Sequence, residues 1–234
     1  MTIQARWSLS RDDGIVCEAE DIRRLVTALT ASVGSVSWEI ECADGVSRSG
    51  SNIEELLAFD NPPDREIQRL IVRARSDDGR AIASVELGGK VASVSASIDG
   101  PSELVQQFRT ALEPQLFGLR AWYTRVARLD FISVVLFFFF VMWLTVTIGM
   151  ALGILATNDE PGLPLRGQAV AYTMIAGAIG AGWLLNRLRE RIFPVATFEM
   201  GQGKRRHELL EKVRWGVVVA FIVSLVSGLL LVFL

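Results

Sequence analysis

Few residues in this sequence have the types and spacing that catalysis would need. His207 is the only histidine, so the chain offers neither a histidine-rich metal site nor the usual general base. Cys17 and Cys42 stand far apart and match no CxxC or metal-binding spacing. We therefore predict no catalytic residues, no metal and no cofactor, and we expect a protein that is not an enzyme.

The segment Met200–Lys204 comes nearest to a phosphate-binding motif, because two glycines precede its lysine. A Walker loop needs a longer spacing and a buried strand before it, so that backbone N–H groups can surround the phosphates. The sequence has neither feature, and we expect no nucleotide site here. His207 follows within a run of bases, which is typical of a solvated basic helix.

Charge divides the chain into an acidic and a basic part. Residues 1–120 contain 19 Asp or Glu and 13 Lys or Arg, whereas residues 121–234 contain 7 and 11. The net charge of the first part is therefore −6, and that of the second is +4. A negative domain is poorly suited to the phosphate backbone of nucleic acids, so we expect no nucleic-acid partner.

Three long stretches without charged residues dominate the second part, and they cover 131–156, 167–186 and 215–234. A helix needs about 20 apolar residues to cross the hydrocarbon core of a bilayer. The sequence therefore predicts three transmembrane helices over these ranges, which makes the lipid bilayer a partner. The alternative is that they are buried helices in the core of a soluble protein.

The distribution of bases predicts the orientation of these helices. The connector 121–130 and the loop 187–214 are rich in arginine and lysine, but the loop 157–166 holds only Arg166. Because basic segments stay on the cytoplasmic side, we expect a multi-pass inner (plasma) membrane protein with a cytoplasmic N-terminus and an external C-terminus. The side chains best suited to lipid headgroups are those of Trp122, Arg125, Lys204, Arg205 and Arg206.

Small residues recur four apart in each uncharged stretch, on one face of the expected helix. Small side chains let helix backbones approach, so we predict helix packing through these faces. The partner helices belong to the same chain, to further copies in a homo-oligomer or to another membrane protein. No acid, base or histidine lies within the stretches, which argues against a coupled transporter. The predicted packing residues are Gly149, Gly153, Gly177, Ala181, Ser224 and Gly228.

Residues 1–120 show the changing periodicity of a small α+β domain. Helical spacing predicts helices that begin near Glu18, Ile53 and Ser102, the last of them interrupted at Pro114. We expect an antiparallel sheet with these helices on one face. Alternation of apolar and polar residues predicts strands over 6–10, 35–42 and 91–98, and a hairpin of 66–75 with 81–87.

The loop 187–214 contains an apolar segment that a solvated linker would lack. Phe193, Phe198 and Met200 lie there between two basic stretches. Apolar side chains grouped in this way usually have a partner surface. We therefore predict that these three residues dock the loop on the N-terminal domain or on the membrane surface.

The combined features support two functional hypotheses. The first is a membrane-anchored binding, sensory or scaffold protein, whose cytoplasmic domain recognises a protein or a small ligand. The alternative is an oligomeric pore-forming or membrane-perturbing effector that the cytoplasmic domain gates. Both depend on architecture, since no motif in the sequence indicates a ligand.

Overall fold

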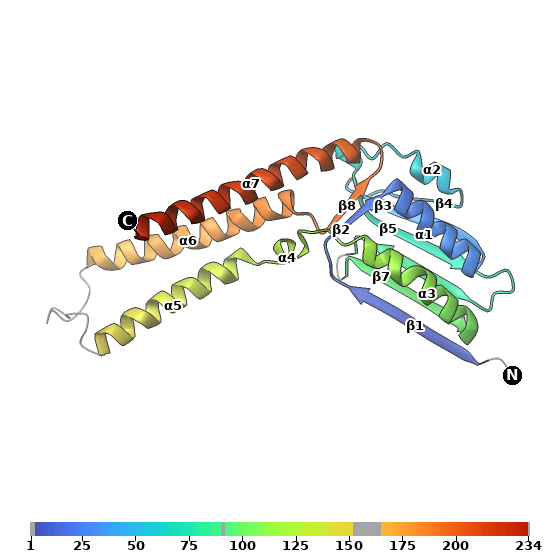
Figure 1. Cartoon of the computed structure of the whole chain (residues 1–234), viewed down its shortest axis with the longest axis horizontal. Helices are drawn as coiled ribbons and strands as arrows, with labels where there is room; N and C mark the ends of the chain where they lie inside the picture. The colour runs from blue at the N-terminus through green and yellow to red at the C-terminus, as the bar shows by residue number, and fades with distance from the viewer. Residues whose placement is uncertain (1–2, 90–91, 152–164, 234) are drawn as a thin grey trace. The chain divides into compact units, whose positions relative to one another are not determined.

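The computed structural model describes residues 3–89, 92–151 and 165–233, and Figure 1 shows their elements. The chain forms two compact units. Unit 1 consists of Met1–Arg125 together with Ile192–Leu234, and unit 2 consists of Val126–Arg191. Along the sequence, unit 2 is therefore an insertion into unit 1. The predicted loop 187–214 is divided between the two units.

A six-stranded antiparallel sheet forms the centre of unit 1, with the strand order β1-β7-β6-β5-β3-β4. Buried and exposed side chains alternate along the strands, so one face of the sheet is apolar. In β5, Leu70 and Val72 are buried, whereas Arg73 and Arg75 are exposed. The strands are β1 (Gln4–Arg11), β3 (Ser35–Cys42), β4 (Ser47–Gly50), β5 (Ile67–Arg75), β6 (Ile82–Leu87) and β7 (Val94–Pro101).

Two helices, α1 (Ala19–Ser32) and α3 (Ser102–Gly118), cover the apolar face and pack on each other (Figure 1). Ile22, Leu25 and Leu29 of α1 recur at helical spacing and are buried in the hydrophobic core. The structure therefore contains the antiparallel sheet with helices on one face that residues 1–120 were expected to form. Shorter elements of the chain are α2 (Ile53–Leu57), η1 (Pro63–Arg65) and α4 (Thr124–Ala127).

Helix α3 continues through Pro114, where the sequence predicted an interruption. Proline removes the hydrogen bond to the carbonyl four residues earlier, that of Thr110. Pro114 and Thr110 both lie on the exposed side of α3, where solvent can bond the free carbonyl. The apolar side of the helix, which includes Phe108 and Leu112, keeps its contacts with the core.

The opposite face of the sheet carries serines and ion pairs. Arg6 of β1 pairs with Asp99 of β7 at 2.7 Å, and Arg73 of β5 pairs with Glu39 of β3 at 2.8 Å. Antiparallel sheets commonly bury one face and leave the other in water. This polar face is therefore the side of the sheet that unit 1 presents to solvent.

A two-stranded sheet joins the two sequence segments of unit 1. Strand β2 (Ile15–Glu18) pairs in parallel with β8 (Ala196–Glu199), which places Cys17 beside Phe198. Strand β8 leads into α7 (Gln202–Phe233), which packs against it. The segment that follows unit 2 is thus built into the fold of the segment that precedes it.

Unit 2 contains α5 (Phe131–Ala151) and most of α6 (Leu165–Ile192). Asp130 accepts a hydrogen bond from the Ser133 hydroxyl at 2.5 Å and another from the Asn186 amide at 2.7 Å. These two hydrogen bonds lower the pKa of Asp130 to about 2. As a carboxylate, Asp130 therefore caps α5 and links it to α6.

Gly182 lies at the contact between α5 and α6. A Cβ atom on Gly182 would lie 3.4 Å from the Cα of Ile132, whereas one on Gly177 would have no neighbour within 4 Å among the described residues. We expect Gly182→Leu to destabilise unit 2 by about 1–3 kcal/mol, because a long side chain has no room against the backbone of α5.

Thermal unfolding followed by circular dichroism measures this effect on the full chain. Gly177→Leu is the matched control, and it should be neutral or slightly stabilising because leucine favours helices more than glycine does. Equal losses of Tm in the two variants would contradict the assigned contact.

The structure contradicts the predicted transmembrane helices. Among the residues that it describes, no helix combines the length and the apolar composition that crossing a membrane requires. The predictions of a multi-pass inner membrane protein, a cytoplasmic N-terminus and an external C-terminus are thus wrong. The predictions rest on runs of uncharged residues, and the runs in α6 and α7 continue into charged turns of the same helix. Residues 152–156 of the first expected span, and 157–164 of the following loop, lie outside the described residues.

Helix α5 exposes large aromatic side chains. Phe137, Phe138 and Phe140 are each more than half exposed. Exposed apolar side chains grouped in this way mark an interaction surface. Unit 2 therefore carries a surface of a different kind from the polar sheet face of unit 1.

Candidate functional site

The segment 193–200 buries most of its large apolar side chains in unit 1. Phe198 and Met200 are 2 % and 1 % exposed and belong to the hydrophobic core. Phe193 is buried against Tyr123, with ring centroids 5.7 Å apart. The three residues predicted to dock the loop are thus held by unit 1, along the path that leads from α6 to α7.

Asn61 anchors β8 from another part of the chain. Its Nδ2 donates to the carbonyl of Phe198 at 2.9 Å, and its Oδ1 accepts from the N–H of Ile67 at 2.9 Å. Asn61 is fully buried and has a φ of 47°, a left-handed conformation that asparagine adopts more readily than most residues. Both its side chain and its backbone conformation are therefore suited to this position.

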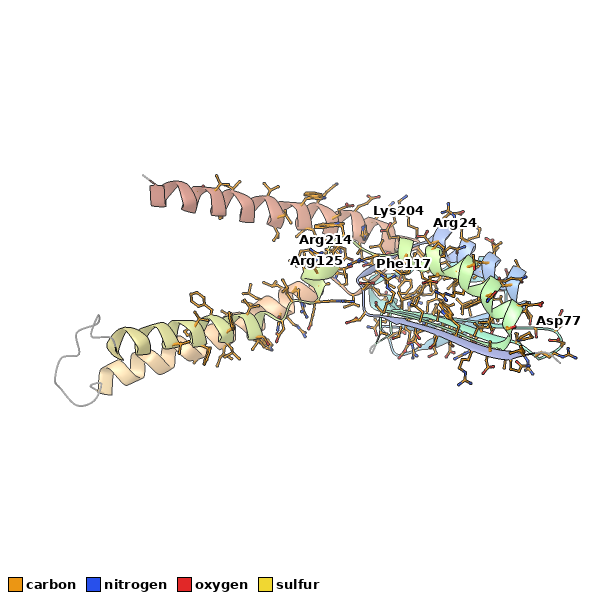
Figure 2. All side chains as sticks on the ribbon, turned by 60° about the horizontal axis from the view of Figure 1, so that its bottom comes forward. Arg24, Asp77, Phe117, Arg125, Lys204 and Arg214 are labelled. Carbon is orange, nitrogen blue, oxygen red and sulfur yellow. The ribbon has the colours of Figure 1, made fainter. Side chains whose placement is uncertain are left out.

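Polar side chains gather where β8, α7 and the residues before α4 meet. We call Tyr123, Thr197, Glu199, His207 and Arg214 the Arg214 cluster. Two of them come from β8 and two from α7, on which Figure 2 labels Arg214. Tyr123, Thr197 and Arg214 are buried, and the side chains of Glu199 and His207 are only 12 % and 13 % exposed.

Arg214 carries a positive charge in the interior. Its side chain is 0 % exposed, its Nε donates to the Ile192 carbonyl at 2.7 Å, and its guanidinium carbon lies 4.1 Å over the Tyr123 ring. Within the described part of the chain, no carboxylate lies within 4.0 Å of its nitrogens, and Nη1 and Nη2 lack hydrogen-bond partners. Burial lowers the pKa of Arg214, although Tyr123, Glu211 and Glu199 oppose this effect. Burying such a group is costly, which points to a role beyond packing.

Other polar atoms of the Arg214 cluster are also unpaired. The hydroxyls of Tyr123 and Thr197 and the Nδ1 of His207 lack hydrogen-bond partners among the described residues. Burial raises the pKa of Tyr123, and the nearby Thr197 and Arg214 counteract this without reaching good hydrogen-bonding geometry. Native proteins leave few buried polar groups unpaired, so a group of them in one place makes the Arg214 cluster the candidate functional site.

His207 and Glu199 form the titratable pair of the cluster, with Nε2 and Oε1 3.1 Å apart. Burial lowers the pKa of His207, and the charge of Arg214 lowers it further, while Glu211, Glu18 and Glu208 raise it. Burial raises the pKa of Glu199, as do the charges of Glu18 and Glu211. The two pKa values therefore move toward each other from their ordinary values of 6.5 and 4.5.

We expect His207→Gln to reduce the loss of stability that acid causes in the full chain. Because the folded pKa of His207 is below 6.5, the unfolded chain takes up this proton first, and the free energy of unfolding falls as the pH drops through 6.5. Glutamine takes up no proton, so this part of the loss disappears. Urea unfolding at a series of pH values measures the free energy of unfolding of both proteins. If the variant and the unsubstituted protein show the same dependence of this free energy on pH, the assigned burial of His207 is contradicted.

Glu199 affects the pH dependence of the free energy of unfolding with the opposite sign. Because its folded pKa lies above 4.5, its ionised form destabilises the folded chain at neutral pH. The free energy of unfolding therefore rises as the pH falls through the folded pKa and Glu199 takes up its proton. Glu199→Gln should therefore raise the free energy of unfolding at neutral pH. Glu208→Gln, at an exposed position of the neighbouring helix α7, is the control for the loss of a carboxylate.

The residues predicted for lipid headgroups lie in varied settings within unit 1. Trp122 is about half exposed and stacks on Trp215 with ring centroids 5.5 Å apart. Arg206 pairs with Glu66 at 3.2 Å. None of these contacts tests a headgroup role. The remaining three, which are exposed, are Arg125, Lys204 and Arg205, the first two labelled in Figure 2.

Three of the residues predicted for helix packing can be assigned an exposure. Gly177, Ala181 and Ser224 are exposed. Gly153 lies outside the described residues. Packing through these faces stays a prediction, while the observed contact between α5 and α6 uses Gly182. The other two, Gly149 and Gly228, lie within α5 and α7.

The comparisons find no relative. Neither protein-family models, nor curated proteins, nor solved structures give a match to this chain. A function must therefore be inferred from the site itself.

The described thiols of unit 1 are buried, and its described acids form no group that could hold a metal ion. In the described ranges, no group of three or more His, Cys, Asp or Glu is placed to hold a metal ion. Cys17 and Cys42 are free and buried, and burial raises the pKa of both thiols, which makes them poor nucleophiles. The Arg214 cluster offers instead unpaired donors and a proton-binding pair inside a folded unit.

Proposed function

We propose that this chain is a sensory binding protein, in which unit 1 recognises a protein or a small ligand and the Arg214 cluster responds to the bound state. The position of Arg214 carries this proposal. Its guanidinium lies on Tyr123, two residues before unit 1 is interrupted at Arg125, and bonds Ile192, where unit 1 resumes. One buried side chain therefore holds both points at which the chain leaves and re-enters unit 1.

The unpaired atoms of the cluster favour a response to binding. A rearrangement that gives Nη1 or Nη2 of Arg214 a partner gains the hydrogen bonds of a charged group, about 1.5–3 kcal/mol each. Four of the five cluster residues lie on β8 and α7, and β8 pairs with β2. A ligand that shifts β2 or β8 thus alters the surroundings of Arg214, and it stabilises whichever arrangement it binds more tightly.

Hydrogen exchange on the full chain tests the proposal. The protein is first screened for binding against amino acids, nucleotides, sugars, polyamines and proteins of a cell extract. For each binder, we expect changed exchange in 119–125 and in 192–200, the two segments that Arg214 joins.

Arg214→Gln provides the decisive comparison, because it removes the charge but keeps a hydrogen-bond donor. This variant should bind with nearly unchanged affinity while the two segments no longer respond together. The proposal fails if no binder of any class is found, or if binders leave both segments unchanged in the unsubstituted protein.

A further inference from the structure

A hollow of about 530 Å³ lies on the polar face of the six-stranded sheet. Its volume falls in the range of small-molecule sites, which is about 300–1,000 Å³. We call it the sheet-face hollow. The polar side chains that line it are Ser10, Glu41, Gln68, Arg69, Glu86 and Ser95.

Strand register brings these residues together. Ser10 of β1 lies opposite Ser95 of β7, and Ser95 lies opposite Glu86 of β6. On the other side, Arg69 of β5 lies opposite Glu41 of β3. Because residues paired in this way share one face of the sheet, hydroxyls and charges from five strands converge on the same side.

Charges of both signs meet in the sheet-face hollow. The Nε of Arg69 donates to Glu86 Oε1 at 2.8 Å, while its Nη1 lies 3.6 Å from Glu41 Oε2. The second distance is long for an ion pair in direct hydrogen-bonding contact. Glu41 and the far end of Arg69 therefore keep binding capacity for groups of a ligand.

Two glycines keep the hollow open beside Glu86. A Cβ on Gly89 would lie 2.3 Å from Glu86 Oε1, and one on Gly88 would lie 2.2 Å from the Gln68 carbonyl oxygen. Gly88 also has a φ of 80°, which residues with a side chain rarely adopt. Because Gly88 and Gly89 have no side chains, the backbone that follows β6 can pass close to Gln68 and Glu86.

We infer that the sheet-face hollow binds a small zwitterion with an ammonium group and a carboxylate, of the kind a free amino acid presents. The guanidinium of Arg69 suits the carboxylate, and Glu41 with Glu86 suits the ammonium. Ser10, Ser95 and Gln68 supply neutral hydrogen-bonding groups around them. A simple anion would face two carboxylates, and a simple cation would face Arg69. This inference depends on the proposed function and names the class of ligand.

Calorimetric titration of the full chain tests the inference, with glycine, L-alanine and L-glutamine as zwitterions and with acetate and methylammonium as their separate halves. We expect at least one zwitterion to bind about tenfold or more tightly than either half, since losing one charged contact removes about 1.4 kcal/mol or more. Acetate or methylammonium binding as tightly as the best zwitterion would overturn the inference, and so would the absence of zwitterion binding at millimolar concentration.

Matched variants locate the site. Ser95→Phe fills the hollow and should abolish binding, whereas Ser97→Phe, on the same face of β7 but outside the hollow, should preserve it. Arg69→Gln should weaken binding at least tenfold, and Arg73→Gln, which breaks the separate pair with Glu39, should not. Circular dichroism confirms that each variant folds, and the arginine pair decides the question if a phenylalanine variant does not.

Equal effects of Arg69→Gln and Arg73→Gln would show that the charges on this face are only structural and would overturn the inference. The proposed function would survive that result if another ligand or a protein still changes exchange in 119–125 and 192–200. It would fall only if no binder acts on these segments.

Discussion

Replacing Asn61 with alanine is expected to lower the free energy of unfolding by about 3–5 kcal/mol, measured by urea unfolding of the full chain. The change leaves the Phe198 carbonyl and the Ile67 N–H without their side-chain partner in a site that is 0 % exposed. Each buried group left unpaired costs about 1–3 kcal/mol. Alanine also resists the φ of 47° that the backbone has here.

Two further substitutions separate these causes. Asn61→Gly accepts the positive φ but loses both hydrogen bonds. Its free energy of unfolding should therefore be higher than that of Asn61→Ala but still well below that of the unsubstituted protein. Asn61→Asp keeps the acceptor for Ile67 but turns an oxygen toward the Phe198 carbonyl, so it should be most destabilising when ionised and recover in acid. If alanine and glycine both leave the stability unchanged, Asn61 is not an anchor of β8.

The periodicity of the sequence predicted the regular part of unit 1 well. Strand β3 occupies 35–42, as expected, because its apolar residues alternate without interruption between a glycine and a turn. The hairpin of β5 and β6 also agrees to within one residue, since the spacer 76–80 is rich in turn-forming residues. Local pattern suffices where an element is long and one of its faces is buried.

The parallel pair of β2 and β8 could not be predicted in the same way. Each strand has only four residues, and each lies far from the other in the sequence. Their pairing depends on Asn61, on the conformation of Gly201 and on the burial of Phe198, none of which produces a local period. The sequence indicated that this apolar segment needed a partner surface, but not which strand would provide it.

The Arg214 cluster was missed for a related reason. The run of bases from Lys204 to Arg214 was interpreted as a solvated helix, and most of its residues are indeed exposed. Gly203, His207 and Arg214 nevertheless recur at intervals of four and seven, which places them on one face of α7. That spacing was the available signal, but a buried arginine is too rare to be expected from spacing alone.

Phe198→Ala is expected to destabilise the full chain by about 3–5 kcal/mol, the usual cost of removing a buried phenylalanine side chain. Phe198 is 2 % exposed in the core, so the cavity is closed to solvent, and weakened packing should also open 193–203 to proteases. Val195→Ala is the matched control, because Val195 lies in the same segment but is 43 % exposed. Unfolding in urea and limited proteolysis measure the two effects, and equal cleavage of both variants would contradict the docking of β8.

Combining Phe198→Ala with Asn61→Ala gives the strictest form of this test. Both substitutions act on β8, one through its side chain and one through its carbonyl, and the Asn61 amide bonds Phe198 directly. Residues that share one structural contact do not contribute additively. Once either change has released β8, the other has less native structure left to disrupt. The double variant should therefore lose clearly less stability than the sum of the single variants, whereas strict additivity would mean that Asn61 and Phe198 stabilise unit 1 independently.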